Sequence, residues 1–430
     1  HQLHRSLARL NLRCFKVRPQ RIQILRTPTA FYESLIERCD RATTRVTLSA
    51  LYWGTGPLAL NLAEAVARAA SRGVAVNVTL DAARAGRRDG DGRTSVDALA
   101  AVADAGGDIH LVDASGRSGL IGEILGVYHA KACVFDDATL LTGANLSEEY
   151  FRSRQDRYVV VRDSKVADWY DRAVRAAAAA PDAGERARAL RELCTGPAPA
   201  PPPRRRRFHR SRRRPAATLF PTAQVRDILD LDARALSAVL AASPRCGLST
   251  AYANPPSAVV EALGRTAATV VVPAPDTHGF AGATGAKAFL PLAHARFAWD
   301  LATKLKGSGD VRAWTAPRET YHAKGCWAFS AGDERRAGAP AAQQVVEREG
   351  RRAVGPLEDE QRRRAQRGDE VGEELQACGA GRVRVGGARH PQAWRSGLVH
   401  APRYGEIWGD MGRYGEIWGD APRAEALHPA

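Results

Sequence analysis

The tetrapeptide YHAK occurs twice in the chain, and each copy places a histidine two residues before a lysine. The pairs are His129 with Lys131 and His322 with Lys324. Side chains alternate along a strand, so on a strand each pair shares one face. An unpaired ammonium group is costly to bury beside a core histidine. Two matched pairs therefore favour a chemical site over two ordinary core histidines.

Paired histidines and lysines are suited to phosphoryl chemistry. One histidine can attack phosphorus and hold a covalent phospho-intermediate. The other can protonate the leaving oxygen and then deprotonate the incoming hydroxyl. The lysines can stabilise the charge on the non-bridging oxygens. If the two copies converge, they predict transfer at one phosphodiester that needs no metal and no cofactor.

Two other kinds of site are less well supported by the sequence. His129, Cys133, His322 and Cys326 could form a zinc site, but the intervening lysines would repel the cation. The chain has no G-x-S-x-G elbow of a serine hydrolase. GATGAK at 282–287 does not have the spacing of a phosphate-binding P-loop.

Helix and strand patterns alternate in the same order in the two halves of the chain. In the first half, helices are predicted at 28–42, 57–73 and 96–107, and strands at 45–53, 74–81, 108–114, 127–135 and 138–144. In the second half, helices are predicted at 222–242, 257–267 and 285–305, and strands at 245–253, 268–274, 310–316 and 320–329. The repeated order predicts an internal duplication and mixed α/β layers.

Composition separates the two halves from a linker and a tail. Residues 197–217, rich in proline and arginine, cannot pack because proline lacks a donor and arginines repel one another. The last hundred residues are rich in Arg, Glu, Gly and Ala, which opposes core formation. The predicted parts are an N-terminal lobe at 13–196, a linker at 197–217, a C-terminal lobe at 218–330 and a disordered tail at 331–430.

Charge and cysteine content limit the partners and the setting. The net charge of +16 implies an anionic partner, which nucleic acid, an acidic membrane or a phosphorylated substrate would each satisfy. The seven cysteines show no CxxC spacing, so reduced thiols are expected. No apolar run is long enough for a membrane span. The chain begins at His1, as a fragment or processed form would, so it says nothing about a leader.

The segments around both copies resemble the phospholipase D superfamily, beginning with HAKACVFD (129–136) and TGANLSEEYFRSRQDRYVVV (142–161). Further blocks make the chain similar to the eukaryotic phosphatidylglycerophosphate synthase family. These are LSALYWGTGPLA (48–59), GANLS (143–147), RQDRY (154–158), APDTHGF (274–280) and TYHAKGCW (320–327). The resemblance covers residues 13–330. It implies two phospholipase D-like α/β lobes, each a mixed sheet flanked by helices.

This resemblance also implies a function. It predicts a mitochondrial, peripheral membrane enzyme that moves the phosphatidyl group of CDP-diacylglycerol to glycerol 3-phosphate and releases CMP, early in cardiolipin synthesis. The expected partners are these substrates and an anionic membrane, and nucleic acid is not expected. A phosphodiesterase or nuclease that uses water as acceptor is the alternative enzyme. A basic protein that binds lipid or nucleic acid through 204–214, with a decayed site, is the non-enzymatic alternative.

The resemblance assigns His129, Lys131 and Asp136 to a first catalytic motif, and His322 and Lys324 to a second. Asp136 lies seven residues after His129, an odd spacing that faces it away on a strand. A turn aspartate with a local structural role is therefore an alternative for Asp136.

Further positions are assigned less directly. The resemblance places nucleotide contact at the turn Gly54, Thr55 and Gly56, where backbone N–H groups before a helix could meet phosphate. An ordinary strand-to-helix turn is equally compatible with this sequence. Asn145 is expected to hold phosphate oxygens, and Asp156 to orient a histidine or to pair with a neighbouring arginine.

The second half departs from the superfamily pattern in one respect. The chain has no asparagine after Asn254, so a counterpart of GANLS is missing and 331–430 stands in its place. The second lobe is therefore predicted to be incomplete, with a poorly supported and even inactive site. The 285–305 helix carries apolar residues that could meet a bilayer or face the core, namely Phe289, Leu290, Leu292, Phe297 and Trp299.

Overall fold

The computed structural model describes residues 6–114, 126–196, 217–329, 347–348 and 380–383. Residues His1–Arg382 form one compact unit and Val383–Ala430 a second. The predicted linker lies almost wholly outside the described residues, and so does most of the predicted tail. Within the tail, two short strands are described, β18 (Glu347–Arg348) and β19 (Ala380–Val383), whereas the sequence predicted none.

The N-terminal lobe is built on a seven-stranded sheet in the order β2-β9-β7-β6-β3-β4-β5. Three adjacent strands are parallel to one another: β3 (Arg45–Ser49), β4 (Ala75–Asp81) and β5 (Asp108–Val112). The rest run antiparallel to their neighbours: β2 (Ile22–Leu25), β6 (Ala132–Phe135), β7 (Ala138–Thr142) and β9 (Tyr158–Arg162). The central strands are buried on both faces, as their continuous apolar runs require.

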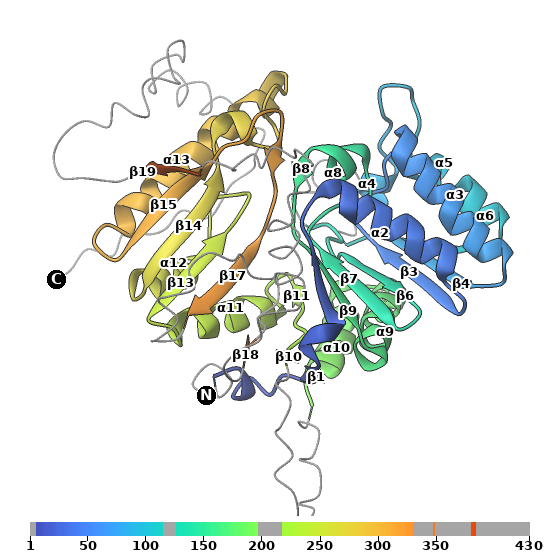
Figure 1. The fold of residues 1–430 in the computed structure, drawn as a ribbon, viewed down its shortest axis with the longest axis horizontal. Helices are drawn as coiled ribbons and strands as arrows, with labels where there is room; N and C mark the ends of the chain where they lie inside the picture. Colours follow the sequence, from blue (N-terminus) through green and yellow to red (C-terminus); the bar gives the residue numbers. More distant parts are fainter. Residues whose placement is uncertain (1–5, 115–125, 197–216, 330–346, 349–379, 384–430) are drawn as a thin grey trace, which may run out of the picture. The chain divides into compact units, whose positions relative to one another are not determined.

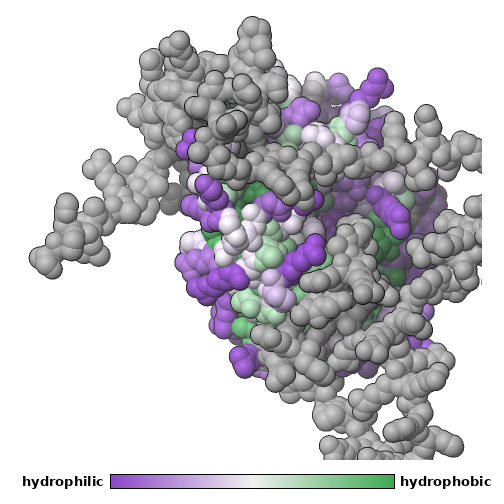
Figure 2. Space-filling view, turned by 60° about the vertical axis from the view of Figure 1, so that its left-hand side comes forward, coloured by the Kyte–Doolittle hydropathy of each residue, from purple (hydrophilic) through white to green (hydrophobic). Residues whose placement is uncertain are grey.

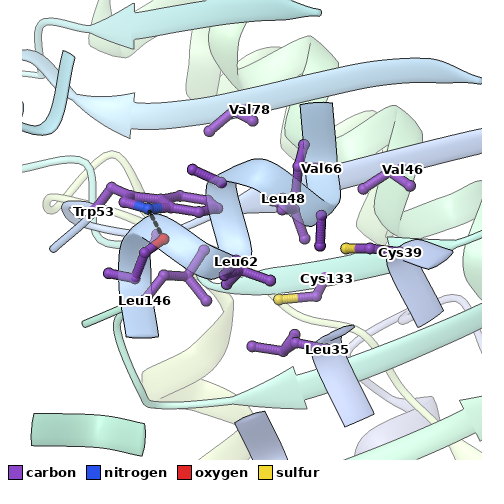
Figure 3. Packing of buried hydrophobic residues seen from close by; sticks show 14 of the residues in the cluster. Leu35, Cys39, Val46, Leu48, Trp53, Leu62, Val66, Val78, Cys133 and Leu146 are labelled. Carbon is purple, nitrogen blue, oxygen red and sulfur yellow. Dashed lines mark hydrogen bonds between the residues drawn. The ribbon is translucent and has the colours of Figure 1, made fainter. Parts of the chain in front are cut away.

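Helices α2 (Pro28–Arg41) and α3 (Pro57–Ser71) pack together over this sheet. The main core of the lobe lies beneath them, where Leu35 and Leu62 meet Leu48 of β3 (Figure 3). Thr27 accepts the N–H of Ala30 and Pro28 follows it, so α2 begins as its sequence predicts. The other helices of the lobe are α4 (Ala82–Ala85), α5 (Ser95–Ala98), α6 (Ala100–Asp104), α8 (Glu148–Arg152), α9 (Ser164–Ala179) and α10 (Ala183–Cys194).

The C-terminal lobe has a sheet in the order β17-β13-β14-β15-β19 (Figure 1). The strands β13 (Arg245–Ser249), β14 (Ala267–Pro273) and β15 (Gly309–Trp314) are parallel, and β17 (Gly325–Phe329) is antiparallel to β13. Its helices are α11 (Leu231–Ala241), α12 (Ser257–Gly264), α13 (Leu290–Lys304), η2 (Pro275–Thr277) and η3 (Gly285–Phe289). The remaining elements are β1 (Phe15–Val17), η1 (Pro19–Arg21), β8 (Arg154–Gln155), β10 (Ala217–Leu219), β11 (Gln224–Val225), β12 (Leu229–Asp230) and β16 (Thr320–Tyr321).

Strand order confirms the internal duplication. The series β6-β3-β4-β5 of the first lobe matches β17-β13-β14-β15 of the second in order and in direction. Beyond β6 the first sheet continues through β7, β9 and β2. Beyond β17 the described part of the chain supplies no further strand to the second sheet. The predicted α/β class with a shorter second lobe is therefore what the described residues form.

Local predictions differ from the structure where the chain changes its pairing partner. The predicted strand 320–329 is interrupted, because β16 pairs with β8 of the first lobe and β17 pairs with β13 of the second. The predicted strand 127–135 is regular only from Ala132. The histidine and lysine of each YHAK segment therefore lie just before β6 or β17 and outside regular strands. The predicted helix 222–242 begins with the β11–β12 hairpin, and 96–107 is broken at Leu99.

Candidate active site

Equivalent serines hold the two YHAK segments against the ends of their parallel strands. At the end of β3, Ser49 Oγ lies 2.9 Å from the Tyr128 hydroxyl and donates to the alanine carbonyl of that segment at 3.0 Å. At the end of β13, Ser249 Oγ lies 2.6 Å from the Tyr321 hydroxyl and donates to the matching alanine carbonyl at 2.8 Å. Each serine therefore fixes the position of the segment that carries its histidine and lysine.

The two lysines also take the same conformation. Lys131 Nζ donates to the carbonyl of His129 at 3.2 Å, and Lys324 Nζ donates to the carbonyl of His322 at 3.0 Å. Each ammonium is thus folded back over its own segment. Two residues further on, Cys133 and the equivalent cysteine of β17 are buried in the hydrophobic clusters of separate lobes.

The zinc alternative is not supported by this arrangement. Burial raises the pKa of the Cys133 and Cys326 thiols to about 12, which opposes the thiolate that zinc requires. Within the described residues, no cluster of three or more His, Cys, Asp or Glu side chains is arranged to hold a metal ion.

The two segments interact electrostatically across the lobes. Burial and then the charge of Lys324 lower the pKa of Lys131 to about 7. Burial also lowers the pKa of Lys324, to about 8. Desolvation by the surrounding protein, and then the charges of Lys131 and Lys324, lower the pKa of His129, although the residue is exposed at the surface. His322 also lowers the pKa of His129, so the two imidazoles and two ammonium groups lie in one electropositive site.

Asp156 of the first lobe accepts a hydrogen bond from the second lobe's histidine. Its Oδ2 lies 2.7 Å from His322 Nδ1, and both residues are buried. Its Oδ1 accepts the N–H groups of Gly143, at 3.3 Å, and Arg157, at 2.7 Å. Backbone pairing fixes the approach, since the His322 N–H donates to the Gln155 carbonyl at 2.8 Å. Bound in this way, the ring presents Nε2 for proton exchange.

Opposing effects act on the His322 ring. Burial, reinforced by Lys324, lowers its pKa to about 4 against the raising effect of the Asp156 hydrogen bond. Lys324 Nζ lies 2.9 Å from each ring nitrogen, and the Tyr150 hydroxyl lies 3.3 Å from Nε2. The ring is therefore neutral at neutral pH and able to accept a proton at Nε2, close to a lysine that can hold an anion.

Asn145 is buried beside the end of β3. Its Oδ1 accepts the N–H of Leu51 at 3.2 Å, which ties the chain after β3 to the GANLS segment. The amide therefore supports the loop that leads to Tyr52. Its predicted contact with phosphate oxygens remains a prediction.

Asp136 has the environment expected of a turn aspartate with a local structural role, and its catalytic role stays a prediction. It follows β6 at the end remote from Lys131 and takes a φ of 48°. Its carboxylate accepts the backbone N–H groups of Thr43, Thr44 and Arg45 at 3.0, 2.8 and 3.0 Å. Partial burial opposes ionisation, but the hydrogen bonds from Thr44 and Arg45 prevail and lower the pKa of Asp136 to about 2. The residue fastens the loop between α2 and β3.

The turn Gly54-Thr55-Gly56 is closely packed by residues of the same lobe. A Cβ atom at its first glycine would lie 2.8 Å from the Cβ of Ser147, so glycine allows close packing there. At the start of α3, the Leu58 N–H donates to Glu148 Oε2 at 2.9 Å. A carboxylate of the same lobe thus occupies the helix start, where the sequence analysis placed nucleotide phosphate. This packing agrees with the alternative of an ordinary strand-to-helix turn, and nucleotide contact at these residues stays a prediction.

Several residues of the site were missed from the sequence. Ser49 and Ser249 sit at equivalent places in LSALYWGTGP and LSTAYANPP, so the repeat carried a usable signal. Tyr150 and Arg154 lie in blocks that carry the resemblance, but their contacts with the second lobe could not be predicted, because they depend on the pairing of β8 with β16.

Comparisons with known proteins agree with this geometry. Residues 35–177 match the family described as "Cardiolipin synthase, PLD-like domain". The fold resembles that of phosphatidylserine synthase from Haemophilus influenzae, with a TM-score of 0.61 and 19% identity over 76% of this chain and 81% of that one. Residues 35–177 are thus similar to a phospholipase D-like domain, and the fold of the chain resembles that of a solved phosphatidylserine synthase.

The chain is also similar to proteins named as CDP-diacylglycerol–glycerol-3-phosphate 3-phosphatidyltransferases. It is 25% identical over 386 residues to the mitochondrial CDP-diacylglycerol–glycerol-3-phosphate 3-phosphatidyltransferase of Cricetulus griseus, covering 74% of this chain and 70% of that protein. The human enzyme of that name is 24% identical over 391 residues, with 74% and 69% covered. A probable enzyme of this name from Dictyostelium discoideum is 33% identical over 169 residues, which are 36% of this chain and 29% of that protein.

Proposed function

We propose that this chain transfers the phosphatidyl group of CDP-diacylglycerol to glycerol 3-phosphate, giving phosphatidylglycerophosphate and CMP. The observation that carries the proposal is the joining of one histidine–lysine segment from each lobe, with Asp156 of the first lobe bound to His322 of the second. The names of the relatives support this donor and acceptor.

In the first step, a ring nitrogen of His129 attacks the phosphorus that bears the diacylglycerol group. A nitrogen–phosphorus bond forms, and the bond from that phosphorus to the bridging oxygen breaks. CMP leaves on this oxygen and takes a proton from His322 Nε2. An anionic substrate between Lys131 and Lys324 favours the imidazolium form of His322 that this step requires.

In the second step, His322 Nε2 takes the proton of the glycerol 3-phosphate hydroxyl, and the resulting oxygen attacks the phosphorus. The nitrogen–phosphorus bond breaks, and His129 returns to its neutral form. Lys131 and Lys324 stabilise the non-bridging oxygens in both steps. Asp156 keeps the proton on His322 Nδ1, so Nε2 is the atom that exchanges protons.

Product analysis tests this proposal. The full chain is incubated with CDP-diacylglycerol in mixed micelles, with and without glycerol 3-phosphate, and the lipids and nucleotides are separated by mass spectrometry. We expect phosphatidylglycerophosphate and CMP in equal amounts. Phosphatidic acid as the sole lipid product, with or without the acceptor, would instead support a phosphodiesterase that uses water. Absence of every product would contradict transfer by this chain.

We infer that the enzyme works in the mitochondrion, at a membrane surface. The mammalian relatives are named as mitochondrial. No helix among the described residues has the length and apolar character needed to span a bilayer. Phe289 and Phe297 are 38% and 42% exposed, and exposed Lys287 and Arg296 lie near them in sequence. Figure 2 shows one side of the molecule, where weakly polar and hydrophobic surface lies between hydrophilic residues.

Flotation with vesicles tests the membrane contact. Aromatic side chains beside basic ones suit an anionic lipid surface. We expect the wild-type chain to float with vesicles that contain anionic lipid, and Phe297→Ser to float less. Equal flotation of Phe297→Ser and wild type would exclude this residue from the contact.

A further inference from the structure

A buried histidine that the proposed reaction does not use lies close to His322. His278 follows η2 and is 1% exposed. Its Nδ1 accepts the N–H of Phe280 at 3.2 Å, so the neutral ring carries its proton on Nε2. That Nε2 is buried and has no hydrogen-bond partner among the residues that the structure describes. Burying a hydrogen-bond donor without an acceptor costs folding free energy, so the position of this N–H group needs an explanation.

A cluster of packed rings lies between His278 and His322 of the candidate active site. The Tyr252 ring lies 5.9 Å from His278 and 6.2 Å from His322 between centroids, edge-on to both. The His294 ring stacks on His278 at 5.0 Å and also packs against the Tyr252 ring at 5.0 Å, and its Nδ1 is likewise buried without a described partner. Burial, and then the neighbours His294, Arg154 and His322, lower the pKa of His278 to about 4. His278 is therefore a neutral donor, one ring away from His322.

A cation from the first lobe reaches the same place. Arg154 Nη2 donates to the carbonyl of Gly279, next to His278, at 3.0 Å. Its Nε donates to Thr320 Oγ1 at 3.2 Å, two residues before His322. No carboxylate forms an ion pair with Arg154 in the described part of the chain. The guanidinium lies over the Tyr150 ring, 5.0 Å from its centroid, and the charge of Glu149 acts on it without forming an ion pair. It therefore lies near an N–H donor that has no acceptor among the described residues.

We propose that Arg154 and the Nε2–H of His278 bind the phosphomonoester of the acceptor substrate. This rests on the proposed function, and it names the residues that select a phosphorylated acceptor. Lys131 and Lys324 already match the charge of the phosphodiester that reacts. Arg154 and His278 add a second anion site, on the side of His322, which activates the acceptor hydroxyl.

The segment that follows His278 gives a route to the buried ring. Residues 279–285 read GFAGATG, and most of them from 281 onward are exposed. Gly282 and Gly285 take φ values of +76° and +63°, which glycine adopts without strain. We expect this segment to move when the acceptor enters, because Nε2 is closed to solvent in the structure.

Two substitutions at the same position test the subsite in the full chain. His278→Phe keeps a ring but removes the donor, whereas His278→Gln places an amide N–H near the position of Nε2. For His278→Phe, we expect the KM for glycerol 3-phosphate to rise about 10- to 100-fold, the range for a lost hydrogen bond to a charged group. We expect His278→Gln to recover most of this loss. A KM within about twofold of wild type in both variants would overturn the proposal.

Exchange of labelled CMP into CDP-diacylglycerol, without any acceptor, separates the two phosphates that the site could bind. It depends on the donor half-reaction alone, so we expect both variants to exchange at the wild-type rate. Loss of exchange with a raised KM for CDP-diacylglycerol would place the CMP phosphate at His278 and overturn the acceptor assignment. Normal exchange also shows that a variant is folded. Should His278→Phe not fold, Arg154→Gln must show the same rise in acceptor KM, and a normal acceptor KM there would overturn the proposal.

Failure of the proposed function itself is seen separately. If the wild-type chain makes no phosphatidylglycerophosphate, the reaction assignment fails before any variant is compared. If the wild type does make it and His278→Phe uses the acceptor normally, only the subsite fails.

Discussion

Asp156 Oδ2 and His322 Nδ1 lie 2.7 Å apart and join the two lobes of the protein. The carboxylate belongs to the segment between β8 and β9, and the imidazole belongs to the second YHAK copy. The adjacent β8–β16 pairing holds both backbones, so the orientation of His322 depends on the first lobe. Neither lobe alone supplies both partners of this hydrogen bond.

Replacing this carboxylate by an amide should reduce turnover with little effect on folding. In Asp156→Asn, the amide oxygen can still accept the N–H groups of Gly143 and Arg157, but nothing holds the proton on His322 Nδ1. We expect kcat to fall roughly 1,000-fold or more, by analogy with the loss of an orienting aspartate in hydrolytic triads. Steady-state kinetics with both substrates measure this, and a kcat within about tenfold of wild type would contradict the orienting role.

Asp136 provides the matched control, since it is the other aspartate assigned to the site from the sequence. Asp136→Asn should leave kcat near the wild-type value and lower the free energy of unfolding by about 1–3 kcal/mol, because charge-assisted hydrogen bonds to the 43–45 backbone are weakened. Denaturant unfolding followed by circular dichroism measures the loss. A fall in kcat as large as that of Asp156→Asn would support a catalytic role for Asp136.

The stability contribution of Asp136 should also depend on pH. Its folded-state pKa of about 2 lies below the ordinary value of about 3.9. The contribution is therefore fully present above the ordinary value and is lost as pH falls from about 4 towards 2. Unfolding curves at a series of acidic pH values should show the difference between wild type and Asp136→Asn shrinking over this range. A constant difference down to pH 2 would disagree with the lowered pKa.

Activity should fall at alkaline pH because the site lysines lose their charge early. The pKa values of Lys131 and Lys324 are lowered to about 7 and about 8, so in the free enzyme the ammonium forms decline as pH rises through this range. We expect kcat/KM for CDP-diacylglycerol to fall above about pH 7–8. Lys131→Arg, which stays charged, should move that fall to higher pH. A kcat/KM that stays constant up to about pH 9.5 would contradict the assignment of these lysines.

Gly325 should not tolerate a side chain, although the first copy of the motif has alanine in the same register. Ser249 is opposite Gly325 just as Ser49 is opposite Ala132. A Cβ atom on Gly325 would displace Nη1 at the end of the Arg157 side chain, and the cost arises because this atom is buried. We expect Gly325→Ala to lower the free energy of unfolding by about 1–3 kcal/mol. The matched Ala132→Gly should cost about 0.5–1 kcal/mol, and an equal cost for both would contradict the clash.

The sequence was informative where one element determines its own structure. The starts of α2 and α3 follow from proline at the helix start and from apolar spacing, and the matching sequence of helices and strands in the two lobes follows from the repeat. The pairing of β16 with β8 could not be predicted, because it depends on how the lobes meet. For that reason the sequence pattern predicts a single strand at 320–329, and it does not predict the contacts that Tyr150 and Arg154 make with the second lobe.

The two aspartates show the same distinction at the level of the site. The odd spacing of Asp136 from His129 already indicated that it faces away, whereas the resemblance favoured a catalytic role. The structure agrees with the spacing. His278 lies in the APDTHGF block that carried the resemblance, but its unpartnered Nε2 is visible only in three dimensions.

Trapping the covalent intermediate tests the central claim, that two histidine–lysine segments from two lobes act on one phosphodiester. The chain is mixed with CDP-diacylglycerol in the absence of glycerol 3-phosphate, quenched at alkaline pH to preserve phosphohistidine, digested and analysed by mass spectrometry. The account predicts a phosphatidyl group on His129, absent in His129→Asn and released as phosphatidylglycerophosphate when the acceptor is added before quenching. Product formation without any histidine-bound phosphatidyl group would contradict it.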